Sequence, residues 1–421
     1  MTTNPDGSTT ETSYSGCGCV GSEQVTTRDE RGRRKRYSKD TLGRLVRTEE
    51  LNWDTSVYAT AYQSYNARDQ LTQINHQGQL RTMEYDGHGR LSRRTTPEQG
   101  ATTYAYNLDD TLSQTVDARG ASSTYSYNGR HLVTGISYGV PAGVAATPNV
   151  SFGYDSAGNR TSMTDGLGSV TYSYNTLSRL QWEERTFTGV GTFRLSYTYN
   201  LAGQLTSMTN PWGVQVGYQY DHTGLLRGVT GAGYGGVTSY ASNLQYRASG
   251  AIKALTYGNG RQLSMSYDTR QRLSRWHVAG VTGSDYAYNY AGWPVSENTG
   301  RVVFADNLYD NTLDRSYEYD QVGRLIVAHT GVEARTHNTG QSQSGALGPY
   351  SQHYGYDQWG NINYRAGWGG WHPSYSITHV NNQVQVGRRY DAAGHFIDDL
   401  WGNIFQYDAT GQQIGRAHLI S

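Results

Sequence analysis

The sequence contains little cysteine, proline or phenylalanine, and its positive and negative charges balance. Among its 421 residues there are 2 Cys, 8 Pro and 6 Phe, and 35 Lys plus Arg balance 35 Asp plus Glu. Two thiols cannot build a disulfide framework or complete a tetrahedral zinc site. Cys17 and Cys19, one residue apart, are interpreted as unpaired thiols because a disulfide between them would be strained. Zero net charge provides no field that would recruit nucleic acid or an anionic membrane.

The sequence also lacks long apolar runs and helical periodicity. No stretch approaches the roughly 18 apolar residues of a membrane-spanning helix, and the N-terminal residues have neither the basic nor the apolar region of a signal peptide. Apolar residues nowhere recur at sustained spacings of three and four, so no helix is expected. What the chain does contain is 52 Gly and 36 Tyr, which favour turns and half-buried strands respectively. The composition therefore predicts an all-β protein.

A seven-residue motif recurs along almost the whole chain. It consists of Tyr, then Asp or Asn, two variable residues, often Gly, a polar residue and an aliphatic residue, as in YDGHGRL at residues 85–91. Copies usually begin 20 or 21 residues apart, and longer gaps such as 127–154 and 319–356 imply loop insertions. A fixed period of this length is typical of a repeat architecture.

Stereochemistry assigns a role to each position of the motif. In YDGHGRL, Tyr85 places its ring on one face of a strand, and Asp86 accepts hydrogen bonds from the following backbone to start a turn. Gly89 supplies the positive φ at which the chain reverses, and Leu91 opens the return strand. The residues that we assign to the repeat turns of the other copies are Tyr106, Asn107, Tyr154, Asp155, Gly158, Tyr174, Tyr199, Gly203, Tyr220, Asp221, Gly224, Tyr267, Asp268, Tyr319, Asp320, Gly323, Tyr356, Asp357, Gly360, Tyr390, Asp391 and Gly394.

Recurrence argues for a structural role of these turns. Asp occupies the second motif position in many copies, whereas a catalytic carboxylate pair would occur once. His88 and Arg90 are replaced by Ala157 and Asn159 in another copy, so we expect no shared chemistry to depend on them.

About 20 residues thus form one β-hairpin, and each hairpin must pair with its neighbours because a lone hairpin is marginal. The sequence predicts consecutive antiparallel hairpins that form one curved sheet over residues 37–413. Residues 1–36 are expected to be an irregular N-terminal segment or a degenerate repeat, and residues 414–421 a tail. Residues 330–350 are polar and rich in Gly and Ser, which predicts a long exposed loop.

Three short motifs resemble functional sites. GISYG at residues 135–139 fits the nucleophile elbow and would make Ser137 the nucleophile of a serine hydrolase, but its flanks promise no helix. GAGYGG at residues 231–236 fits a dinucleotide fingerprint without the βαβ context that such a site needs, so we interpret it as a loop. RDERGRRKR at residues 28–36 is basic, and a solvated turn is the simpler interpretation.

Tryptophans in WGGWHPSY, at residues 368–375, are the best candidate for a ligand platform. Trp368 and Trp371 could stack on a sugar or a partner chain, although aromatic packing at a sheet edge explains them equally well. The histidines, among them His329 and His337, have no accompanying carboxylates at a recognised metal spacing. No cofactor or metal is expected.

The copies YDSAGNR (154–160), YDQVGRL (319–325) and YDQWGNI (356–362) resemble the YD repeats of the RHS family. That family includes bacterial polymorphic toxins, C subunits of insecticidal toxin complexes, and teneurins. The resemblance covers roughly residues 37–413 and implies an all-β fold in which the sheet spirals into part of a hollow shell. In the bacterial members the shell encloses a C-terminal toxic polypeptide, and in teneurins it supports adhesion domains.

The resemblance implies a non-enzymatic shell segment of a larger secreted or cell-surface protein. Its expected partners are the remainder of the shell and an enclosed cargo chain, with no nucleic acid. The stretch around Asp-Pro and Gly-Arg-Phe that the bacterial family links to self-cleavage is not found here, so neither proteolysis nor toxicity is carried over. An extracellular module that binds glycans or cell-surface proteins is the alternative, and a hydrolase at Ser137 is the remote one.

Overall fold

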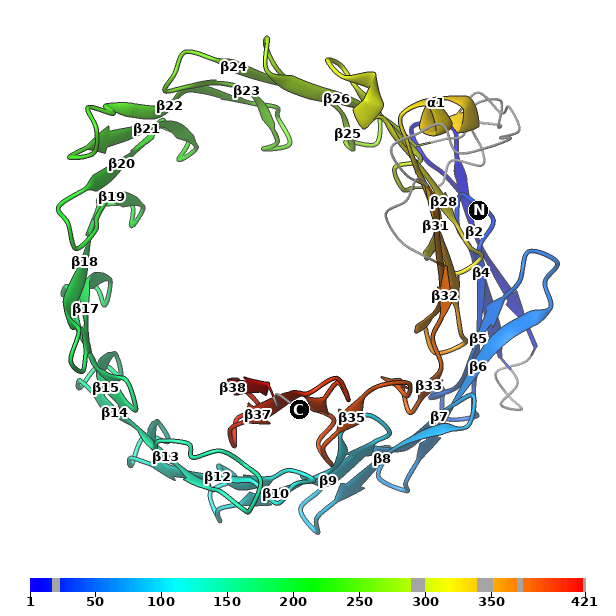
Figure 1. The fold of residues 1–421 in the computed structure, drawn as a ribbon, viewed down its shortest axis with the longest axis horizontal. Coiled ribbons are helices and arrows are strands. Elements are labelled where there is room, and N and C mark those ends of the chain that lie inside the picture. The colour runs from blue at the N-terminus through cyan, green and yellow to red at the C-terminus, as the bar shows by residue number, and fades with distance from the viewer. Residues whose placement is uncertain (17–22, 289–299, 339–350, 369–373, 419–421) are drawn as a thin grey trace. The chain divides into compact units, whose positions relative to one another are not determined.

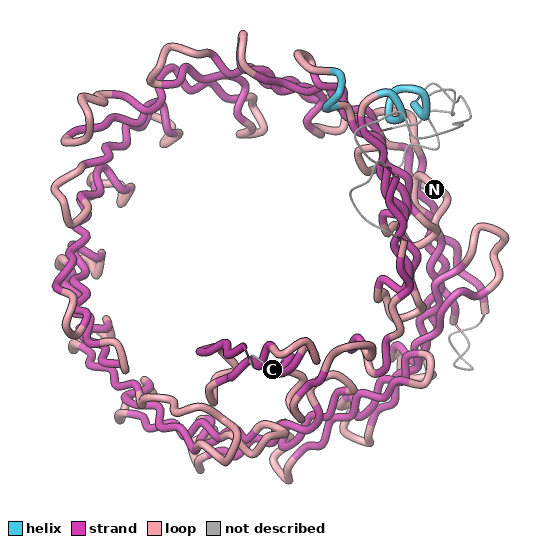
Figure 2. Tube along the Cα trace, viewed as in Figure 1, coloured by secondary structure: helices cyan, strands magenta, loops and turns pink. Residues whose placement is uncertain are grey.

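The computed structural model describes residues 1–16, 23–288, 300–338, 351–368 and 374–418, and these consist almost entirely of β-strands joined by tight turns (Figures 1 and 2). The chain divides into two compact units. Unit 1 contains residues 1–88, 94–98 and 264–388, and unit 2 contains residues 89–93, 99–263 and 389–421. The predicted all-β class, built from consecutive antiparallel hairpins, is confirmed.

Unit 1 consists of two runs of strands that are distant in sequence. The first run contains β1 (Thr2–Thr3), β2 (Thr9–Ser15), β3 (Gln24–Arg28), β4 (Arg34–Lys39), β5 (Leu45–Leu51), β6 (Val57–Tyr65), β7 (Leu71–His76) and β8 (Gln79–Tyr85). The second contains β25 (Leu273–Val278), β26 (Thr282–Ala287), β27 (Phe304–Asn307), the 3-10 turn η3 (Asn311–Leu313), β28 (Arg315–Tyr319), β29 (Leu325–Thr330), α1 (Val332–Asn338), β30 (Ser351–Tyr356), β31 (Ile362–Trp368), β32 (Tyr375–Ser376), β33 (His379–Val380) and β34 (Gln383–Val384).

Unit 2 contains one long run of hairpins and a short C-terminal group. The long run contains β10 (Gly100–Tyr106), β11 (Leu112–Val116), β12 (Ser122–Tyr127), β13 (Val133–Gly139), β14 (Val150–Tyr154), β15 (Arg160–Asp165), β16 (Gly168–Tyr174), β17 (Leu180–Phe187), β18 (Gly191–Tyr199), β19 (Leu205–Thr209), β20 (Gln215–Tyr220), β21 (Leu226–Ala232), β22 (Ser239–Tyr246) and β23 (Ile252–Tyr257). The C-terminal group contains β35 (Arg389–Tyr390), β36 (Phe396–Asp398), β37 (Asn403–Tyr407) and β38 (Gln413–His418). Two further strands, β9 (Leu91–Thr96) and β24 (Gln262–Tyr267), have residues in both units.

The seven-residue motif forms the same turn in each regular copy, which we call a YD turn. In the copy at 106–112, the Asn107 amide donates to the Thr111 carbonyl over 2.8 Å, and the Asp110 amide donates back to the Asn107 carbonyl over 3.2 Å. Tyr106 pairs with Leu112 across a register shift. This is a type I turn closed by a residue in the left-handed region, the G1 bulge. Gly89 has the required φ of 86°, and Asp110 adopts 65° in its place.

The turns at the other ends of the hairpins lie on the opposite edge, because antiparallel strands alternate in direction. We call these the far turns. They include the connections 4–8, 29–33 and 77–78 in unit 1, and 117–121, 140–149 and 166–167 in unit 2. Every hairpin therefore contributes one YD turn to one edge and one far turn to the other.

Two predicted segments differ from the structure. Residues 332–338, expected to belong to an exposed loop in a chain without helices, form α1, because Glu333 and Ala334 are buried where the helix packs on β28 and β29. Residues 339–350 of that predicted loop lie outside the described residues. The predicted tail is also wrong for residues 414–418, which belong to β38 and pair with β37.

Few side chains are fully buried, since most strand residues of a single-layered sheet keep partial contact with solvent. The largest buried apolar side chains of unit 1 include Leu51 and Val303, and those of unit 2 include Val170. Much of the cohesion must therefore come from polar contacts at the turns. In unit 1, Figure 1 shows β28 and β31 on the same side as β2 and β4, and side-chain hydrogen bonds join the two runs where the 357–361 turn meets β6 and β7.

Candidate functional site

In ten copies the repeated tyrosine bonds its hairpin to the one before it. The Tyr106 hydroxyl donates to the carbonyl of Leu91, the aliphatic residue that closes the preceding motif, over 2.9 Å. Nine further pairs make the same bond at 2.7–2.9 Å: Tyr65 to Leu45, Tyr85 to Leu71, Tyr127 to Leu112, Tyr154 to Val133, Tyr220 to Leu205, Tyr246 to Leu226, Tyr288 to Leu273, Tyr319 to Val302 and Tyr356 to Leu325. Phenylalanine has no hydroxyl, so this bond explains why these ten positions hold Tyr and not Phe.

The polar residue at the sixth motif position links successive YD turns. The Arg90 guanidinium lies 4.6 Å above the Tyr106 ring, and it donates to the Asn107 carbonyl and to Asp110, over 3.2 and 2.6 Å. Equivalent links to the next turn join Arg44 to Asp69, Asn159 to Ser178, Arg179 to Asn200, Gln204 to Gly224 and Arg324 to Asp357. Arg, Asn and Gln all reach the neighbouring turn from this position, so Arg90 and its counterparts share a structural contact that the sequence did not indicate.

The motif aspartate organises both the turn and this polar residue. In the copy at 319–325, Asp320 Oδ1 accepts from the amides of Val322 and Arg324, at 3.0 and 2.8 Å, while its Oδ2 accepts from Arg324 Nε at 2.6 Å. Arg324 then stacks 4.7 Å above the ring of Tyr356. Hydrogen bonds lower the carboxylate pKa in several copies; in Asp155 the side chain of Asn159 is the largest cause. A copy of this kind is therefore a joint built from one Asp, one Arg and the next Tyr.

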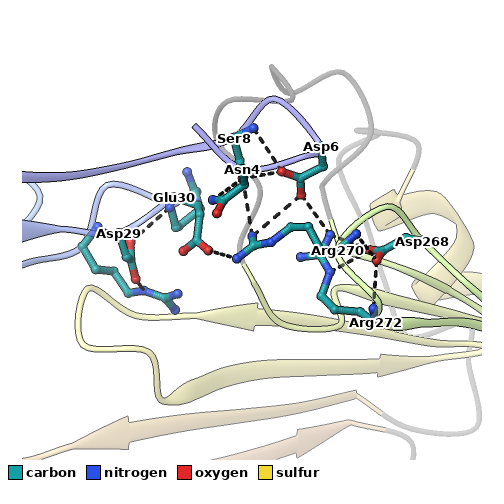
Figure 3. A network of polar contacts seen from close by, with 10 residues as sticks. Asn4, Asp6, Ser8, Asp29, Glu30, Asp268, Arg270 and Arg272 are labelled. Atoms are coloured by element: carbon teal, nitrogen blue, oxygen red, sulfur yellow. Dashed lines mark hydrogen bonds and ion pairs between the residues drawn. The ribbon is translucent and has the colours of Figure 1, made fainter. Parts of the chain in front are cut away.

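In unit 1 the YD turns of the later run dock on far turns of the first run. Figure 3 shows one such contact, where Arg270 and Arg272 of the 268–272 turn meet Asp6 and Glu30. Arg270 pairs with Glu30 at 2.5 Å and Arg272 with Asp6 at 3.0 Å. Burial opposes ionisation of Asp6, but hydrogen bonds from Ser8 and the two arginine charges outweigh it and lower its pKa.

Other docked turns use backbone groups as well. The Tyr58 hydroxyl donates to the carbonyl of Asp357 over 3.0 Å, and Trp359 Nε1 donates to the carbonyl of His76 over 2.8 Å. In unit 2, the amide of Ala145 donates to the carbonyl of Tyr407 over 2.9 Å, so the YD turn at 408–412 docks on the far turn at 140–149.

The short motifs that resembled functional sites are ordinary parts of this sheet. Ser137 lies inside β13, opposite Thr124, and is followed among the described residues by a loop and a strand, which is not the strand-to-helix turn of a nucleophile elbow. Residues 231–236 end β21 and form the following far turn, and residues 28–36 form a far turn with its flanking strands.

Several sequence candidates lie outside what the structure describes. Trp371, Cys17 and Cys19 are in undescribed segments, and the side chain of Trp368, at the end of β31, is also outside the described part. The proposed ligand platform therefore stays a prediction. Among the described residues, no group of three His, Cys, Asp or Glu side chains is arranged to hold a metal ion.

A buried polar cluster beside α1 was missed by the sequence analysis. Ser351 Oγ lies 3.0 Å from His329 Nδ1 and 3.3 Å from His353 Nε2, and Glu333 Oε2 lies 3.3 Å from the same His329 nitrogen. A Ser–His–Glu relay needs the two partners on opposite imidazole nitrogens, and Ser351 is only 3% exposed. The cluster therefore holds α1 against the sheet. No spacing of these residues in the sequence predicts that they meet.

Comparisons with known proteins agree with the repeat assignment. A family model described as RHS Repeat matches residues 65–101 and 151–189. A comparison with curated proteins finds no match. No helix among the described residues is long and apolar enough to cross a membrane.

Solved structures of toxin complexes have the same fold. The crystal structure of TcdB2-TccC3 superposes with a TM-score of 0.76 at 16% identity, covering 93% of this chain. The structure of the Photorhabdus luminescens Tc holotoxin pore with mutation TccC3-D651A gives 0.79 at 15% identity and covers 100% of this chain. The chain spans about a quarter of the length of those chains, 23% and 24% respectively. The family model thus identifies RHS repeats at two places in this chain, and the described residues share the fold of these toxin-complex structures.

Proposed function

We propose that the chain is a non-enzymatic wall segment of an RHS shell that encloses a cargo polypeptide. The observation that carries the proposal is the repeated joint: the same tyrosine bond and the same turn-to-turn link recur from hairpin to hairpin in each unit. An arrangement that recurs in this way fixes neighbours and offers no singular reacting group.

A wall made in this way would act sterically. Opening it at one hairpin requires breaking the ladder bonds, the tyrosine bond and the polar link together, so the sheet resists local opening. Its strands expose Thr, Ser and Gln next to partly buried tyrosines. Such a surface can surround an unfolded chain without the tight grip that a continuous apolar wall would give.

The nature of the cargo is suggested by the similar structures. One is a TcdB2-TccC3 complex without a hypervariable C-terminal region, and another is TcdB2-TccC3-Cdc42. By analogy, the cargo of this shell would be a C-terminal polypeptide of the same parent protein, with the remainder of the shell as the other partner. The parent protein would be secreted or displayed at the cell surface.

Protease protection tests the proposal directly. The parent protein, expressed with the sequence that flanks this chain in its gene, would be treated with trypsin at increasing urea concentration. Enclosure predicts that the cargo segment resists digestion until the urea concentration at which the β-sheet signal is lost. Digestion of the cargo in native buffer, at the rate of the same segment expressed alone, would refute it.

A further inference from the structure

The far turns of unit 2 between residues 166 and 237 each expose one large apolar side chain. Leu167, Val190, Trp212 and Tyr234 lie at four successive far turns, with exposed fractions of 65%, 75%, 75% and 64%. Each hairpin adds two strand spacings, about 10 Å, so the row is about 30 Å long. Single exposed apolar residues are ordinary, but an aligned series marks an interaction surface. We call these four residues the apolar row.

Aromatic packing connects the middle of the row. The Phe193 ring lies 6.1 Å from Phe187 and 6.2 Å from Trp212, so the turns at 188–190 and 210–214 share one aromatic cluster. At one end, beside Tyr234, residues 235–240 and 257–259 line a shallow groove that includes the rings of Tyr240 and Tyr257. Exposed aromatics backed by further rings are typical of binding hot spots.

The preceding far turns of the same unit are already covered, and YD turns cover them. Arg119 of the 117–121 turn lies 3.7 Å from Asp391 of a YD turn, and the 140–149 turn holds the YD turn at 408–412 through Ala145 and Thr147. The covered and uncovered turns are continuous, since a Cβ on Gly166 would lie 2.3 Å from Pro148. The apolar row therefore extends an interface whose occupant is known to be a row of YD turns.

A second copy of this chain carries a matching pair of apolar residues. On the opposite edge of unit 2, the YD turns expose Leu108, Leu177 and Leu201. Leu177 and Leu201 lie on successive YD turns, so their spacing equals that of neighbouring residues in the apolar row, whereas Leu108 lies three hairpins before Leu177. We propose that the apolar row of one copy binds the YD turns carrying Leu177 and Leu201 of a second copy, so that chains stack head to tail. Such an interface is heterologous, so it can add further copies in one direction unless the rotation between copies closes a ring.

Sedimentation velocity over a concentration series, with two variant pairs, tests this interface. One pair, Val190→Asp with Trp212→Asp, places charges in the apolar row. The other, Leu177→Asp with Leu201→Asp, places charges on the mating YD turns. Val386→Asp, a change at another exposed apolar residue outside both rows, is the matched control. All these side chains are exposed, so far-UV circular dichroism should be unchanged.

The stacking predicts that wild-type protein and Val386→Asp form species that grow with concentration, while each variant pair alone stays monomeric. An equimolar mixture of the two pairs must yield dimers, because each supplies the row that the other retains. A wild-type chain that remains monomeric throughout would overturn the proposal. So would association that persists in both variant pairs, which would assign it to the unpaired strand edges, or a mixture that stays monomeric.

Discussion

Replacing Tyr127 by Phe removes one repeat bond and leaves the rest of the joint in place. Tyr127 ends β12, and its hydroxyl donates to the Leu112 carbonyl over 2.7 Å. The same strand offers a matched control two residues earlier: Tyr125 is also half-buried, and its hydroxyl has no hydrogen-bond partner among the described residues. The two substitutions delete the same atom in the same strand, and they differ in the loss of the bond to Leu112.

The magnitude follows from ordinary hydrogen-bond energetics. A net bond contributes about 1 kcal/mol, and a carbonyl left without its donor in a half-buried place adds to the loss. Tyr127→Phe should therefore lower the free energy of unfolding by about 1–2 kcal/mol, and Tyr125→Phe should leave it within about 0.5 kcal/mol of the wild type. If all ten such bonds act alike, they supply roughly 10 kcal/mol, comparable to the whole net stability of a typical domain.

Urea unfolding followed by far-UV circular dichroism measures both variants under the same conditions. The midpoint should fall for Tyr127→Phe at an unchanged slope with urea, since the surface exposed on unfolding stays the same. Equal urea midpoints for the two variants would refute the idea that the hydrogen bond from the Tyr127 hydroxyl stabilises the repeat.

Three further predictions concern the turns and the tyrosines. Gln271 has a φ of 65° at the motif position usually held by Gly, so Gln271→Gly should raise the free energy of unfolding by about 1 kcal/mol. Gly43 has a φ of 80° with open space around it, so Gly43→Ala should lower the free energy of unfolding by a similar amount. The midpoint of urea unfolding measures both changes. Arg324→Ala removes charge-assisted bonds and the stack on Tyr356 and should cost about 3 kcal/mol, with Arg324→Lys recovering little because Lys cannot stack and donate in the same plane. Burial raises the pKa of Tyr127 and Tyr356 above the ordinary value of 10.0. The stability that their neutral forms contribute is therefore complete below pH 10 and is lost as the pH rises through the folded-state pKa. The urea midpoint should stay constant from pH 7 to 9 and fall at pH 11.

The repeat period and the residues that form each turn could be predicted from the sequence because both depend on residues close together in the chain. Asp86, Gly89 and Leu91 belong to one turn, and the preference of Asp for backbone amides and of Gly for positive φ acts within a few residues. The all-β class and the hairpin array follow from the same pattern. The family resemblance rested on those positions as well.

Contacts between repeats could not be read in the same way. The bond from Tyr106 to Leu91 joins residues 15 positions apart in sequence, and the role of Arg90 emerges only when the next YD turn is placed beside it. Helix α1 was missed because its seven residues are too few to show a helical period, and burial of Ala334 against the sheet stabilises it. Tertiary packing overrides weak local preference in such short elements.

Electron cryo-microscopy of the parent protein, containing this chain with its flanking sequence, tests the central claim most directly. The account predicts a β-walled particle whose strands follow the hairpin order described for each unit, with additional density of a cargo polypeptide on its inner side. A solid, helix-containing particle, or a hairpin sheet with no enclosed polypeptide, would contradict the assignment of this chain to the wall of a cargo-enclosing shell.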